Sequence, residues 1–311
     1  MEISEFITWD KFDIKRMVKT EPETRTSKAR QDPNNPSKII DSVQYQILPI
    51  KYEYDKEVRG EKVKVVAPLA VELPKLRAPS GIIRRKSMYG NGETAHVFTI
   101  FDMSNEDCAK LCSLDKNSFW TSLYDWFVNR LWELRSQIPS VKKLPSKEAM
   151  PGMFAFPIYY PRDPNTSEVI KGSNPSKYMP LRCFGEPGTP KRRECVFKAP
   201  VEDKTGEPFK TIPWEILESA SFEYIPIVVF KQLYIGGGKV VMQYDVISAV
   251  VTSITPIGTR SLQTETLNKY KENKEVYERL KREIEYFESG FRRKEDDNVS
   301  LKQFLSESFD D

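Results

Sequence analysis

The chain has 311 residues, of which 39% are hydrophobic and 30% are charged. This share of apolar residues is enough for a folded core, so a wholly disordered chain is excluded. Lysine and arginine number 48 against 45 aspartates and glutamates, and a net charge of only +3 indicates no particular partner. The single histidine, His96, excludes a histidine-rich metal site and leaves one residue to serve any Ser-His-Asp or Cys-His centre.

The sequence carries no pattern typical of export or membrane insertion. Its first residues are charged from Glu2 onward and lack the apolar run of a signal peptide. No window approaches the roughly 18 uncharged apolar residues that a membrane-spanning helix needs. The cysteine spacings fit no zinc ribbon or finger, so we expect reduced thiols and no metal site. The four residues are Cys108, Cys112, Cys183 and Cys195.

Residues 1–38 are predicted to form an N-terminal arm and a flexible linker. Apolar residues recur through residues 1–16, which suits a short amphipathic segment. Residues 20–37 are polar, interrupted by proline and free of aromatic side chains, which is typical of a linker. We therefore expect the arm to dock on the body or on a partner.

Residues 39–260 are predicted to form a β-rich domain. The segments DSVQYQILPIKYEY and EVRGEKVKVVAPLAVELPKL are rich in β-branched and aromatic residues, and HVFTIFDM predicts a further strand. Residues 139–226 hold 14 of the 22 prolines, so strands there must be short. The segments MFAFPIYY, SKYMPLRCF and ECVFKAP are the strands we expect in that region.

The clearest β pattern comes late in the chain. Two β-rich runs, 225–235 and 239–254, flank Gly236, Gly237 and Gly238. A short glycine loop between two such runs predicts a β-hairpin.

Two helices are predicted. Residues 104–138 carry apolar residues at spacings of three and four from Trp120 to Ile138, and Pro139 ends the pattern. Residues 261–295 predict a charged helix with a seven-residue aromatic and aliphatic repeat over 262–293. That repeat favours either a coiled coil that joins copies of the chain or a helix packed on its own domain.

The C-terminal residues 296–311 form an acidic tail. The tail carries five acids and one lysine, a charge of −4, which leaves +7 on the rest of the chain. Phe304 and Phe309 interrupt the acids. We expect this tail to compete with nucleic acid for a basic groove and to contact replication proteins, so that its deletion should tighten binding.

The excess positive charge is concentrated in two stretches that also carry aromatic residues. Residues 75–86 hold five cations and no acid, and residues 171–198 hold seven cations against two acids. Cations neutralise phosphates, and rings stack on unpaired bases, so this combination predicts a single-strand nucleic-acid site. The predicted phosphate contacts are Lys75, Arg77, Arg84, Arg85, Lys86, Lys177, Arg182, Lys191, Arg192 and Arg193. The predicted stacking residues are Tyr89, Tyr178, Phe184 and Tyr234.

Patterns typical of enzymes are weak. The segment GGGK, residues 236–239, lacks the spacing of a phosphate-binding loop and is followed by a predicted strand. No acidic pair has the placement expected of a metal nuclease. We therefore expect a binding protein without catalytic residues, metal or cofactor.

Four segments together resemble the single-stranded-DNA-binding proteins of large cytoplasmic DNA viruses, the poxvirus proteins and their giant-virus relatives. These segments are HVFTIFDM, FWTSLYDWFVNRLWELRSQI, SKYMPLRCF and YIPIVVFKQLYIGGGKVVMQYDVISAVV. The resemblance covers roughly residues 40–255. It implies an OB-like barrel that coats single strands without sequence specificity during viral DNA replication or repair, in the host cytoplasm or the virion and without a cofactor.

The fold expected from these observations is α+β. Its body is a partly closed antiparallel β-barrel of the OB-like type, with one helix packed against it and a charged C-terminal helix. The expected partners are single-stranded DNA or RNA, with no membrane. The alternative is a viral structural or assembly protein, such as a minor capsid component, and it predicts that the two basic stretches lie on opposite faces.

Overall fold

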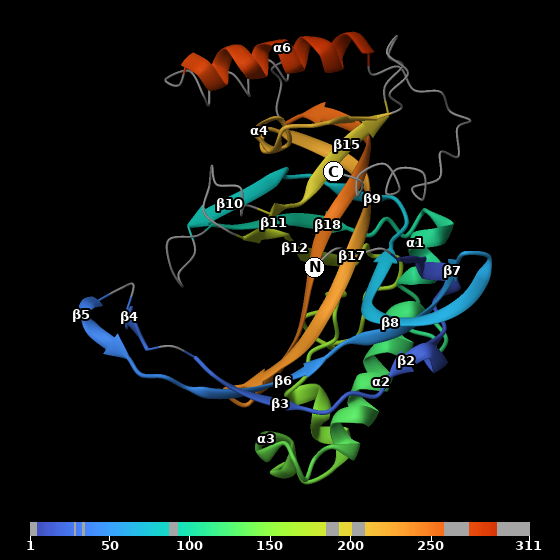
Figure 1. Cartoon of the computed structure of the whole chain (residues 1–311), viewed down its shortest axis with the longest axis vertical. Coiled ribbons are helices and arrows are strands. Elements are labelled where there is room, and N and C mark those ends of the chain that lie inside the picture. Colours follow the sequence, from blue (N-terminus) through green and yellow to red (C-terminus); the bar gives the residue numbers. More distant parts are fainter. Residues whose placement is uncertain are drawn as a thin grey trace.

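The fold is strand-rich, and a computed structural model describes it for residues 5–27, 29–32, 35–86, 93–184, 193–200, 209–257 and 274–290. A closed five-stranded β-barrel with additional strands and few helices forms the body (Figure 1). This confirms an α+β barrel, and the barrel is closed where the sequence predicted only partial closure.

Five strands close the barrel. They are β9 (Leu76–Ala78), β11 (Glu93–Ile100), β12 (Ser176–Leu181), β17 (Ala220–Gly236) and β18 (Lys239–Pro256). Around the barrel β9 pairs with β11, β11 with β12, β12 with β18, β18 with β17, and β17 with β9. The β12–β18 pair is parallel and the other four are antiparallel, which corrects the purely antiparallel expectation.

The long β17–β18 hairpin organises the sheet, as its sequence pattern predicted. Gly237 and Gly238 form the turn with φ of +58° and +74°, a conformation that favours glycine. Register shifts after Glu223, Ile227 and Phe230 introduce irregularities that bend long strands. The hairpin can therefore curve through the molecule and pair with β9, β12 and three peripheral strands (Figure 1).

The peripheral strands extend the sheet on both sides of the hairpin. β6 (Gln44–Pro49) and β8 (Glu61–Glu72) pair with β17, and β7 (Lys51–Val58) pairs with β8. β15 (Val196–Pro200) pairs with β18, and β16 (Phe209–Thr211) pairs with β15. Further short strands are β10 (Ile82–Lys86), β13 (Cys183–Phe184) and β14 (Arg193–Glu194). Most of the predicted strands are thus confirmed.

The predicted helix over 104–138 is interrupted. It consists of α1 (Glu106–Leu111), α2 (Phe119–Glu133) and the short α3 (Pro139–Lys142). Between α1 and α2, Ser113 and Asp115 bond to each other, and such local side-chain bonds offer the backbone an alternative to the helix. The apolar face of α2 does pack into the core: Trp120 is fully buried and lies 5.9 Å from the ring of Phe230 on β17.

The N-terminal segment is part of the sheet, so the predicted flexible linker is wrong for much of its length. β1 (Ile7–Thr8) pairs with β8, β2 (Met17–Val18) with β7, and β3 (Glu23–Thr26) with β6. Sequence composition missed these pairings because each partner strand lies far along the chain. β4 (Arg30–Asp32) and β5 (Asn35–Ile40) form a separate hairpin that projects from the body (Figure 1).

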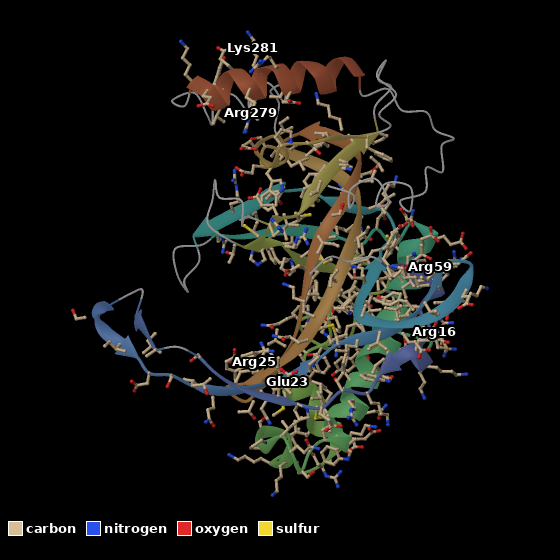
Figure 2. The ribbon with its side chains drawn as sticks, viewed as in Figure 1. Arg16, Glu23, Arg25, Arg59, Arg279 and Lys281 are labelled. Carbon is tan, nitrogen blue, oxygen red and sulfur yellow. The ribbon has the colours of Figure 1, made fainter. Side chains whose placement is uncertain are left out.

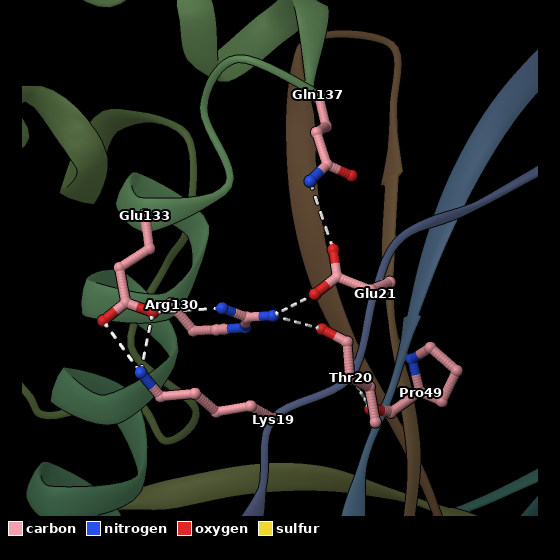
Figure 3. A network of polar contacts seen from close by, with 7 residues as sticks. All are labelled: Lys19, Thr20, Glu21, Pro49, Arg130, Glu133 and Gln137. Atoms are coloured by element: carbon pink, nitrogen blue, oxygen red, sulfur yellow. Dashed lines mark hydrogen bonds and ion pairs between the residues drawn. The ribbon is translucent and has the colours of Figure 1, made fainter.

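A polar network fastens this segment to α2 (Figure 3). The guanidinium of the buried Arg130 donates to the Thr20 carbonyl at 2.8 Å and to the carboxylates of Glu21 at 2.7 Å and Glu133 at 3.0 Å. Thr20 donates its hydroxyl to the Pro49 carbonyl at 2.6 Å. One side chain thereby ties residues 20–21 to the helix and, through Thr20, to β6.

Replacing Arg130 with methionine is expected to lower the free energy of unfolding by about 1–3 kcal/mol, because hydrogen bonds to charged partners are lost. Lys19→Met is the matched control: Lys19 also bonds to Glu133, but its side chain is 63% exposed, so its loss should cost at most about 1 kcal/mol. Urea unfolding of both variants measures the difference. Equal destabilisation would contradict a central role for Arg130.

The proline-rich middle contains fewer strands than predicted. Residues 153–160 make only isolated bridges, between Phe154 and Val240 and between Tyr159 and Ser176. The prolines within and after this segment, Pro157 and Pro161, supply no backbone donor for a ladder. The segment therefore lies along strand edges without becoming a strand.

The C-terminal helix α6 (Lys274–Gly290) packs on its own chain. Leu280 and Ile284 are fully buried, and Arg279 bonds to Glu215, in the helix α4 (Trp214–Leu217), at 2.9 Å (Figure 2). These two positions of the repeat are therefore covered by the chain's own domain, as the packed-helix alternative expects. The predicted helical residues 262–273 and the acidic tail lie outside the described residues.

Candidate nucleic-acid interface

The two basic stretches lie on opposite edges of one strand, β11. β9 and β10 pair with one edge, so residues 76–86 run beside it. β12 pairs with the other edge, where Phe98 faces Tyr178 and His96 faces Pro180. The sheet thus brings together, on the three strands β10, β11 and β12, residues that lie about 100 positions apart in the sequence.

Successive side chains along β10, β11 and β12 point to opposite faces, so one set faces the barrel and the other set faces outward. Val97 and Thr99 are buried, whereas the intervening Phe98 is half-buried. Paired residues share a face, so Arg85, which pairs with Thr94, and Tyr178, which pairs with Phe98, lie on the outer side. An aromatic residue and a cation therefore occupy the same face of the two strands that flank β11.

Four of the predicted phosphate contacts have no carboxylate partner within the part of the chain that the structure describes. Arg77 and Arg85 are exposed, and Lys177 and Arg182 are half-buried. The closest polar contact of Arg182 is a 3.5 Å approach to the Glu194 carbonyl, at the limit of a hydrogen bond. These four side chains retain donors for an anion.

Two predicted contacts are already neutralised. The Lys75 ammonium lies 3.3 Å from the Glu223 carboxylate, and the Arg84 guanidinium bonds to the Glu218 carboxylate. Both glutamates come from β17 or the turn before it, more than 100 residues away. The structure therefore assigns Lys75 and Arg84 to the closure of the barrel rather than to a free cationic surface.

The other predicted residues lie outside the described part of the chain or away from β11 and β12. Tyr89, Lys191 and Arg192 lie outside the described residues, as do the side chains of Lys86 and Phe184. Arg193 is exposed on β14, which pairs with β13. Tyr234 is half-buried at the far end of β17, where its ring lies 5.1 Å from that of Tyr45. Tyr234 is thus separated along β17 from β11 and β12.

The predicted stacking residue that the structure places most favourably is Tyr178. Its side chain is 58% exposed, and its ring lies 5.0 Å from that of Phe98 at an angle of 47°. Phe98 supports one side of the ring and leaves the rest open to solvent. Exposed aromatic residues of this kind are the platforms on which unpaired bases stack.

A pocket of about 760 Å³ opens beside Tyr178. One wall is the β11–β12 ribbon, and the other is the segment 155–162. Five aromatic residues, two cations and five small or apolar residues line it: Phe98, Leu114, Ala155, Phe156, Ile158, Tyr159, Tyr160, Arg162, Val169, Ser176, Lys177 and Tyr178. No carboxylate is among them, so the pocket combines aromatic surface with positive charge.

Burial removes part of the hydration from two of the cations in this region. It lowers the pKa of Lys177, because the ammonium loses hydration and no carboxylate compensates. It also lowers the pKa of Arg182, and the Arg182 Nε has no hydrogen-bond acceptor among the described residues. A phosphate beside either side chain would offset this desolvation.

Sequence reasoning missed Tyr159, Phe156, Tyr160 and Arg162. The run FPIYYPR contains them, and it was interpreted as part of a strand because its aromatic residues suit a β pattern. A signal was present: four aromatic residues and one arginine lie within nine residues of a proline-rich stretch that cannot bury them all in a sheet.

No helix within the described ranges is long and apolar enough to cross a membrane. No group of three or more metal-ligating side chains occurs in the same part of the chain. In comparisons with known proteins, no family model and no curated protein matches the sequence.

Proposed function

We propose that this protein binds single-stranded nucleic acid, without sequence specificity, on the outer face of β11 and β12. The observation that carries the proposal is that exposed Tyr178 and exposed Arg85 share the outer face, on the two strands that flank β11, while Arg182 directly follows β12. Such cations contact the phosphate backbone, which is the same for every sequence. The aromatic rings stack on bases, and every base offers a π-face.

We further propose that the barrel is OB-like. Taken in chain order, its first strand, β9, pairs with the second, β11, and the fourth, β17. Its third and fifth strands, β12 and β18, run parallel. This connectivity is compatible with an OB barrel, in which the face of the second and third strands binds oligonucleotides. Those strands are β11 and β12 here, the two that carry Phe98 and Tyr178.

Single strands are the expected ligand because bases in a duplex already stack on each other. Tyr178 and Phe98 present rings at the surface of a sheet.

The assembly alternative rested partly on the N-terminal arm and the seven-residue repeat. β1, β2 and β3 pair with the body, and Leu280 and Ile284 are buried against the same chain. The β4–β5 hairpin, which projects from the body, stays compatible with that alternative.

Titration with labelled oligonucleotides of equal length tests the proposal. We expect binding to the single strand at least tenfold tighter than to the duplex, with weak dependence on sequence. Tyr178→Ala is expected to weaken single-strand binding by about 1–3 kcal/mol, the usual contribution of one stacked base. Tyr178→Phe, which keeps the ring, is the control. Equal affinity for both nucleic acids, or no binding at low salt, would overturn the proposal.

A further inference from the structure

From the geometry of the pocket beside β12 we infer that it holds one unstacked nucleotide, with the base between Tyr159 and Tyr178 and the phosphate at Lys177 and Arg162. The inference rests on the proposed function, because it names a nucleotide as the ligand. It adds a discrete subsite for a single nucleotide to a surface whose other proposed contacts are with the phosphate backbone of the nucleic acid.

The backbone fixes the relation between the two tyrosines. Tyr159 and Ser176 form an antiparallel bridge, each donating its amide to the other's carbonyl at 2.9 Å. Tyr178 lies two residues after Ser176 on the same strand and thus on the same face. Residues in this diagonal relation are about 7–8 Å apart.

That separation suits one base. Atoms in van der Waals contact lie about 3.5–4.0 Å apart, so a flat ring between two others needs a gap of about 7–8 Å. Tyr159 is 62% exposed and Tyr178 is 58% exposed, and no ring contact joins the two among the described side chains. Both therefore leave a π-face for a ligand.

The inner part of the pocket is fixed and apolar. The Tyr160 hydroxyl donates to the Cys112 carbonyl at 2.6 Å, which holds the buried ring against the body. Phe156 packs 5.8 Å from that ring, and Ile158 is buried beside it. The volume of about 760 Å³ lies within the range typical of small-molecule sites.

The cations are placed to select a phosphate. Lys177 lines the pocket beside Tyr178 and has no ion pair among the described residues. Arg162 donates from Nη1 to the Ser167 carbonyl at 2.7 Å, which orients the guanidinium and leaves its other nitrogens available. One side chain from each wall of the pocket thus offers donors to an anion.

Two further pockets among the described residues are poor sites for an anion. One, of about 530 Å³, is lined by Asp10, Asp13 and Asp115. Another, of about 300 Å³, includes Glu194 and Glu215. Carboxylates repel phosphate, so of these three pockets the one beside Tyr178 has the lining that fits a nucleotide best.

The experiment titrates the full chain with 2-aminopurine deoxyribonucleoside 5′-monophosphate, whose fluorescence falls when the base stacks on a ring. We expect saturable quenching with one nucleotide per chain. Tyr159→Ala should weaken binding at least fivefold, as expected from the loss of about 1 kcal/mol or more of stacking. Tyr159→Phe should retain it, and Tyr45→Ala, at the far end of the sheet, is the matched control.

A second variant distinguishes the contribution of the phosphate to binding from the contribution of the base. Lys177→Gln should weaken binding of the monophosphate at least threefold and leave binding of the free nucleoside unchanged. Unsaturable quenching, or equal quenching in wild type and Tyr159→Ala, would overturn the nucleotide pocket. If oligonucleotides still bind in that case, the proposed function stands. If oligonucleotides fail to bind while the mononucleotide saturates, the proposed function falls and the pocket remains.

Discussion

Neutralising Arg77, Arg85, Lys177 and Arg182 together, each by glutamine, is expected to weaken single-strand binding by more than tenfold at low salt. Each cation that contacts a phosphate releases about 0.7 of a condensed counterion from a single strand. Removing four contacts should therefore reduce the slope of log K against log salt by about 2.8. Titrations at several salt concentrations measure both quantities.

A matched variant removes four cations from the β7–β8 hairpin. It replaces Lys51, Arg59, Lys62 and Lys64 with glutamine and changes the net charge equally. Arg59 lies at the tip of this hairpin, away from β10 and β11 (Figure 2). The control should keep nearly the whole salt slope. An equal loss in both variants would mean that only the total charge matters and that β11–β12 is not the binding face.

Replacing Trp120 with alanine is expected to lower the free energy of unfolding by about 3–5 kcal/mol. Trp120 is fully buried where α2 meets the barrel, 5.0 Å from Phe119 and 5.9 Å from Phe230. The substitution would leave a cavity between these rings that the closed barrel cannot collapse to fill. Denaturant unfolding, followed by circular dichroism, provides the measurement.

Trp120→Phe separates the effect of lost side-chain volume from the effect of the buried indole donor. The indole Nε1 of Trp120 is buried without a hydrogen-bond acceptor among the described residues. Phenylalanine removes this unsatisfied donor and most of the volume change, so it should cost clearly less than alanine. Val66→Ala, at a position that is 51% exposed, should change the stability by no more than about 0.5 kcal/mol. Similar losses for Trp120→Ala and Val66→Ala would contradict the packing described for α2.

The elements that could be predicted are those with a local signal. The β17–β18 hairpin has two β-rich runs and a glycine turn, and α2 has apolar residues at helical spacing, so both are visible in short windows. Closure of the barrel has no such signal, because the β9–β17 and β12–β18 pairs join distant residues. For the same reason β3 was taken for a linker: its partner β6 determines its structure.

The candidate site was predictable only in part. The two basic stretches contain Arg85, Lys177 and Tyr178, which the sheet places on β10 and β12, the two strands that flank β11. Charge counting could not separate these from Lys75 and Arg84, because Glu223 and Glu218, which neutralise them, come from another region of the chain. Tyr159 was missed because its role depends on a bridge to Ser176, not on its neighbours in sequence.

The hairpin that closes the barrel is also the part of the described body that is synthesised nearly last. β6, β8, β9, β12 and β15 all pair with β17 or β18, which begin only at Ala220. A nascent chain that ends before this residue therefore exposes five strands that each lack the partner of one hydrogen-bonding edge, and such edges promote aggregation. A chain truncated before Ala220 would lack two of its five barrel strands, so translation must pass this hairpin before the barrel can close.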